Sequence, residues 1–107
     1  MTNSHIILEQ IQKHFKLNTT QVCDSYAQLC DSYEVVDLSD NAQYCDIDIL
    51  VETSQLVFTY AHKDDVDYNQ MTVDLNDIES VEENLIYVKA YLSCAHSTEF
   101  INERNNT

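Results

Sequence analysis

The sequence predicts one α+β domain: two N-terminal helices, a three-stranded antiparallel sheet and a C-terminal helix. Three observations lead to this fold class. Apolar residues recur every three or four positions near both ends of the chain, whereas they alternate with polar residues in the middle. A chain of 107 residues with 44% apolar residues is also long and apolar enough for one core. We expect the domain to span residues 1–107, with a frayed tail at 102–107.

The first helix is predicted over residues 4–16. Ile7, Ile11 and Phe15 lie on one stripe there, while the intervening positions are mostly polar. The helix is expected to end near Leu17.

A second helix is predicted from Asn18, which suits an N-cap. The segment contains a seven-residue repeat, because Cys23-Asp24-Ser25-Tyr26 recurs as Cys30-Asp31-Ser32-Tyr33. Seven residues are two helical turns, so Asp24 and Asp31 would share one helix face about 10.5 Å apart. The opposite stripe would consist of Val22, Tyr26, Leu29, Tyr33 and Val36.

The middle of the chain has the period of strands. Residues 37–43 are turn formers and are expected to be a loop. Polar and apolar residues then alternate over residues 45–52, which predicts a half-buried strand. Residues 56–60 and 71–75 complete an expected three-stranded meander.

The C-terminal helix is predicted to begin at Asp77. Asn76 and Glu79 have the spacing of a capping box, and apolar residues follow at intervals of three and four. The stretch from Leu85 to Leu92 also has some strand propensity, so that its conformation stays open at this point.

Acidic residues dominate the composition. Nineteen Asp and Glu against five Lys and Arg give a net charge of −14, and between Leu17 and Val88 the only base is Lys63. This charge disfavours direct binding to nucleic acid or to an anionic membrane and favours a basic protein partner. An acidic surface that serves only solubility is the alternative. The predicted partner-binding residues are Asp24, Asp31, Glu34, Asp37, Asp40, Asp46, Asp48, Glu52, Asp64, Asp65 and Asp67.

Several functional classes lack their sequence signals. The chain contains no Gly and no Pro, which excludes glycine-based phosphate loops and nucleophile elbows. No secretion signal and no run of 18 apolar residues is present, so we expect a soluble, cytoplasmic protein whose four cysteines are reduced. Two disulfides are the minority alternative.

Metal sites and catalysis are also not predicted. The cysteines lack the paired spacing of a zinc site. Asp65, Asp67 and Asn69 match the first ligands of a calcium loop, but Gln70 replaces its glycine and Asn76 its bidentate glutamate. No histidine accompanies a nucleophile in a recognisable motif. We therefore expect no enzyme activity, no cofactor and no metal.

In size, charge and lack of motifs the chain resembles the DNA-mimic inhibitors of phages and mobile elements. These include anti-CRISPR, anti-restriction and uracil-DNA glycosylase inhibitor proteins. The helix ending in His14-Phe15-Lys16-Leu17, the acidic segment after it and the hairpin from Ile49 to Tyr60 resemble the staphylococcal type of glycosylase inhibitor. No site residue is carried over from that family, because the resemblance includes no diagnostic motif.

The resemblance implies evasion of a host defence system by inhibition of a nucleic-acid-binding protein. A CRISPR effector is the preferred target, and a restriction enzyme, a glycosylase or a nuclease would fit the same class. Two alternatives remain open. One is an immunity protein or antitoxin that neutralises a basic nuclease toxin, and the other is an acidic adaptor without inhibitory action.

Overall fold

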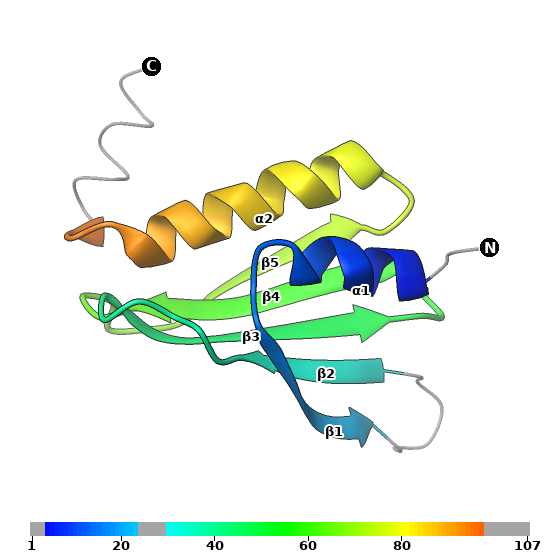
Figure 1. Cartoon of the computed structure of the whole chain (residues 1–107), viewed down its shortest axis with the longest axis horizontal. Coiled ribbons are helices and arrows are strands. Elements are labelled where there is room, and N and C mark those ends of the chain that lie inside the picture. Colours follow the sequence, from blue (N-terminus) through cyan, green and yellow to red (C-terminus); the bar gives the residue numbers. More distant parts are fainter. Residues whose placement is uncertain (1–3, 24–29, 98–107) are drawn as a thin grey trace.

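The computed structural model describes residues 4–23 and 30–97, and the side chains of residues 6–18 and 31–97. It contains an antiparallel five-stranded sheet in the order β1-β2-β3-β4-β5, with a helix before and after it (Figure 1). The elements are α1 (Ser4–Gln12), β1 (Leu17–Cys23), β2 (Cys30–Val35), β3 (Ala42–Leu50), β4 (Gln55–His62), β5 (Asn69–Asp74) and α2 (Ile78–Ser93). The expected tail at 102–107 lies outside the described residues.

The prediction of two N-terminal helices and three strands is wrong. The segment expected to be the second helix contains β1 and β2, which pair with each other, and β2 also pairs with β3. The predicted helical stripe would bury Val36, but Val36 is 43% exposed whereas Val35 is 4% exposed. Tyr33 and Val35 instead alternate with Ser32 and Glu34 in the period of a strand.

Pairing with β3 explains why the strand conformation wins over the helix. A repeat of seven residues with apolar positions at three and four is compatible with a helix, but local spacing is a weak guide when tertiary contacts are available. In the sheet, Tyr33 lies opposite Ile47 and contributes to the single core. Cross-strand packing of this kind is what stabilises strands.

The alternation predicted for the middle of the chain is present. Ile47 and Ile49 of β3 and Phe58 of β4 are buried, while Asp46 and Asp48 lie on the opposite face. The predicted first strand at 45–52 is shifted along the chain: β3 begins at Ala42, within the loop expected at 37–43, and ends at Leu50, and residues 51–54 form the turn to β4.

Both helices pack against the same face of the sheet. Ile7 and Ile11 of α1 and Val81 and Leu85 of α2 belong to one buried cluster with the inward residues of β3 and β4. Figure 1 shows the two helices above the sheet and α2 running over β4 and β5. Gln10 Nε2 also donates to Glu82 Oε2 over 2.9 Å and joins the helices. The other face of the sheet carries no helix from the described part of the chain.

Turns and caps form without glycine. Ser54 takes a positive φ of 54° in the turn between β3 and β4, a conformation that glycine would adopt more readily. Asp77 is the N-cap of α2 and accepts a hydrogen bond from the Ser80 amide over 3.1 Å. The cap is thus one residue later than the predicted box of Asn76 and Glu79. The stretch from Leu85 to Leu92 is helical.

Candidate partner-binding surface

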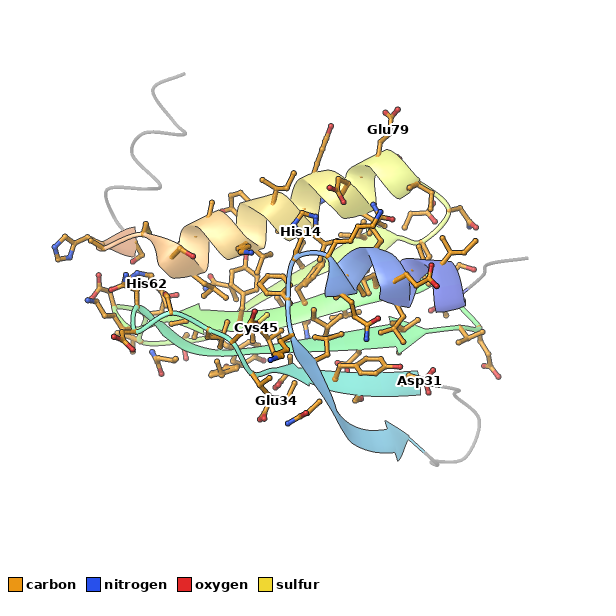
Figure 2. The ribbon with its side chains drawn as sticks, in the orientation of Figure 1. His14, Asp31, Glu34, Cys45, His62 and Glu79 are labelled. Carbon is orange, nitrogen blue, oxygen red and sulfur yellow. The ribbon has the colours of Figure 1, made fainter. Side chains whose placement is uncertain are left out.

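The face of the sheet opposite the helices is the candidate binding surface, and we call it the open face. Its members follow from the register, because residues directly opposite each other on neighbouring strands share a face. On β2 to β5 they include Ser32, Glu34, Asp46, Asp48, Leu50, Gln55, Val57, Thr59, Gln70, Thr72 and Asp74. Figure 2 shows Glu34 pointing away from both helices. The three carboxylates on β2 and β3 form the acidic triad: Glu34, Asp46 and Asp48. A fourth carboxylate of this face, Asp74, lies on β5.

The acidic triad places like charges beside one another. Glu34 lies directly opposite Asp46 in the register, and Asp48 follows two residues along β3. Residues in these positions are about 5 Å and about 7 Å apart. Partial burial, the carboxylate of Glu34 and the carboxylate of Asp48 together raise the pKa of Asp46 above its ordinary value. The electrostatic energy of the triad therefore opposes folding.

Little in the described structure compensates this repulsion. The Ser32 hydroxyl donates to Asp48 Oδ1 over 2.6 Å, which is a local hydrogen bond without a counter-charge. The four lysines within the described ranges are Lys13, Lys16, Lys63 and Lys89, and none of them lies on β2 to β5. A cation supplied by another molecule would relieve the repulsion.

The remaining predicted residues do not join the triad. Asp24 lies outside the described residues. Asp31 is on β2 but faces the helix side, opposite the buried Ile49. Asp37 accepts a hydrogen bond from the Lys16 amide over 2.9 Å, in the loop after β2. The last group consists of exposed residues in three different turns: Asp40, Glu52 and Asp67.

Asp64 and Asp65 are parts of the internal structure. Asp65 accepts hydrogen bonds from the Tyr91 hydroxyl at 2.8 Å to both carboxylate oxygens, from Asn69 Nδ2 at 3.0 Å and from the His62 amide at 2.8 Å. These contacts fasten the turn between β4 and β5 to the end of α2. Asp64 Oδ2 lies 3.7 Å from Nδ1 of the buried His62. Asp65 therefore holds the fold together, whereas Asp64 stays exposed in the turn.

The buried His62 completes this connection. Its Nδ1 accepts from the Asp64 amide over 3.1 Å, and its Nε2 lies 2.7 Å from the carbonyl oxygen of Cys94. A ring that accepts at Nδ1 and faces a carbonyl at Nε2 carries its proton on Nε2. His62 thus joins β4 to the residue after α2.

Three of the four described lysines lie around the C-terminal end of α1, and this cluster was not predicted: Lys13, Lys16 and Lys89. A hollow of about 580 Å³ is lined by Lys13, His14, Lys16, Asp37 and Lys89, among other residues. Lys89 Nζ donates to the His14 carbonyl over 2.9 Å, just after α1 ends. Cations are favourable at a helix C-terminus, so this cluster is explained by the dipole of α1. The concentration of bases near the chain ends was the available signal.

Within residues 4–23 and 30–97, no group of three or more His, Cys, Asp and Glu is placed to hold a metal ion. The absence of an enzyme activity and of a cofactor stays a prediction. No helix in the described part of the chain is long and apolar enough to cross a membrane.

Comparison adds no family to this picture. Searches of protein-family models, of curated proteins and of solved structures found no match to this chain.

Proposed function

We propose that this chain is an acidic DNA-mimic inhibitor that binds a nucleic-acid-binding protein or nuclease of a host defence system through the open face. The observation that supports the proposal is the acidic triad: Glu34 and Asp46 are directly opposed, and none of the described lysines lies on β2 to β5. Like charges opposite each other cost stability. The cations of a basic partner would remove this repulsion, and its removal would add to the binding free energy.

The spacing of the triad suits cations arranged for a nucleic-acid backbone. Carboxylates two residues apart on a strand are about 6.6 to 7 Å apart, roughly twice the rise of 3.4 Å per nucleotide of one DNA strand. Lys and Arg side chains that hold phosphates also form strong hydrogen bonds with carboxylates. In this mechanism Asp46 and Asp48 occupy positions two nucleotide steps apart along the axis, and the partner cannot hold nucleic acid at the same time.

The sheet also changes how the mimicry would work. Asp24 and Asp31 were predicted to share one face of a helix. In the structure Asp31 instead lies on strand β2, on the side of the sheet that the two helices cover. The mimicking surface is therefore proposed on β2 and β3, and the uncharged side chains of Val57 and Thr59 on β4 extend it as a nearly flat contact area.

A competition assay with a captured partner tests the proposal. The full chain is immobilised and incubated with host lysate at low and at high salt, and retained proteins are identified by mass spectrometry. The retained protein is then purified and titrated with the chain in the presence of labelled nucleic acid. We expect displacement of the nucleic acid, weakening as the salt concentration rises.

Two variants of equal charge locate the binding surface. Neutralising the acidic triad with Glu34→Gln, Asp46→Asn and Asp48→Asn should weaken partner binding by roughly 10- to 100-fold. The control neutralises three exposed acids elsewhere, with Asp40→Asn, Glu52→Gln and Glu79→Gln, and should retain affinity within about threefold. Equal losses in the two variants would show that bulk charge rather than the open face binds. Recovery of no basic nucleic-acid-binding protein would contradict the proposal as a whole.

A further inference from the structure

One edge of the sheet has backbone groups directed away from the fold. In the described structure β5 is a terminal strand, with β4 on one side only. The Leu75 amide donates to the Ser54 carbonyl over 2.9 Å, so this pair is a hydrogen-bonded pair of the ladder. Such pairs alternate with non-bonded ones in an antiparallel sheet. The register then directs the N–H and C=O groups of Gln70 and Thr72 away from β4.

This edge lacks three of the features that often protect an edge strand. Proteins blunt edges with proline, lysine or bulges. β5 contains neither proline nor lysine, and its register with β4 is regular from Gln55↔Asp74 to Tyr60↔Asn69. The other edge strand, β1, has an irregularity between Thr19 and Gln21. Of the two edges, β5 is the regular one.

A hollow lies beside the β5 edge, on the helix side of the sheet. It measures about 390 Å³ and is lined by Met71 of β5 and by Glu83, Asn84 and Tyr87 of α2. Every second side chain of a strand added to β5 would point toward this side. An apolar side chain of medium size could therefore enter the hollow between Met71 and Tyr87.

We propose that the β5 edge binds a short, extended, basic segment of a partner protein as a sixth strand. The charge around the edge selects this occupant, because Asp67, Asp74 and Glu83 are all exposed there. A second copy of the chain would instead bring two sets of these carboxylates together, and each copy carries a net charge of −14. Strand addition supplies main-chain hydrogen bonds, and the hollow supplies side-chain selectivity. This site uses the backbone edge of β5, whereas the proposed function rests on the carboxylates of β2 and β3, although Gln70 and Thr72 are also members of the open face.

The test uses the full chain and a defined probe peptide. The probe is acetylated and amidated KTKLKTK, in which lysines alternate with threonine and leucine. Amide hydrogen exchange is followed by NMR with and without the peptide. At saturation the Gln70 and Thr72 amides should exchange at least about tenfold more slowly. The Met71 and Val73 amides face β4 in the same register and serve as internal controls that change little.

Two controls separate strand addition from simple attraction between charges. The same peptide N-methylated on residues 3 to 6 keeps its charge but loses the N–H groups that pair with β5, and should bind at least about tenfold more weakly. The Thr72→Pro variant removes an outward N–H and should lose about tenfold in affinity, whereas Thr72→Val should bind like the wild type. If Thr72→Pro fails to fold, the exchange measurement on the wild-type chain still decides.

Three results would overturn the proposal. The first is equal binding of the two peptides, and the second is protection confined to amides around the acidic triad. The third is a dimer without peptide that Thr72→Pro dissociates, which would assign the edge to a second copy of the chain.

Discussion

Neutralising Asp46 should stabilise the fold, because this carboxylate is held against two others. The change is Asp46→Asn, which keeps the shape of the side chain and removes one charge from the acidic triad. Asp46 has a raised pKa because of its partial burial and because of Glu34 and Asp48. A carboxyl group whose pKa is raised by folding destabilises the folded state once it ionises. The variant lacks this penalty.

The expected gain is about 1 kcal/mol at neutral pH. At separations of about 5.5 Å and about 7 Å, two unit charges in water repel the third by about 0.75 and about 0.6 kcal/mol before screening. Salt at 0.1 M reduces these values by roughly half. Partial burial of Asp46 increases the penalty of its charge again, whereas its exposed part remains screened by solvent. A gain of about 1 kcal/mol corresponds to a rise in Tm of about 4–8 °C.

Thermal and urea unfolding at several pH values provide the assay. The advantage of Asp46→Asn should be absent below the ordinary Asp pKa of 3.8, should develop as the pH rises through the raised pKa of Asp46, and should then stay constant. Added salt should reduce it. Asp40→Asn is the matched control, because Asp40 is exposed in a loop, and it should change stability by less than about 0.5 kcal/mol. A destabilised Asp46→Asn variant, or an advantage independent of pH, would refute the electrostatic reasoning.

The internal contacts lead to three further predictions. Asp65→Asn should destabilise the fold by about 2–3 kcal/mol in urea unfolding, because the carboxylate accepts hydrogen bonds from Tyr91 and from the turn between β4 and β5. The control Asp67→Asn should change stability by less than about 0.5 kcal/mol. Equal effects of the two variants would contradict the role assigned to Asp65. Burial raises the pKa values of Cys45, Tyr60 and Tyr91 to about 12, so the stability of the fold should decrease as the pH rises from about 9 toward 12. Ultraviolet titration should show one fewer late-titrating tyrosine in Tyr91→Phe than in the wild type. The Cys45 thiol is fully buried and should react with a thiol reagent only at the rate of unfolding; reaction at the rate of a free thiol would show that the core opens locally.

Part of the candidate site was predictable and part was not. Asp46 and Asp48 were expected on one face of a strand, because their alternation with Ile47 and Ile49 is a local pattern. Asp65 and Asp67 are two residues apart and look alike in the sequence. In the structure Asp65 is hydrogen-bonded to Tyr91, whereas Asp67 is exposed. A list of acids cannot separate such residues, since the difference arises from a contact with α2.

The sequence by itself determined the features that depend on neighbours along the chain. These are the net charge, the alternation in the middle strands and the amphipathic helix that follows Asp77. Tertiary structure alone decided the conformation of residues 17–23 and 30–35, where an apolar spacing compatible with a helix was overridden by strand pairing. That pairing also brings Glu34 opposite Asp46, twelve residues away, and so creates the acidic triad. The physical reason is that strands are stabilised by partners distant in sequence, whereas helical periodicity is written in adjacent residues.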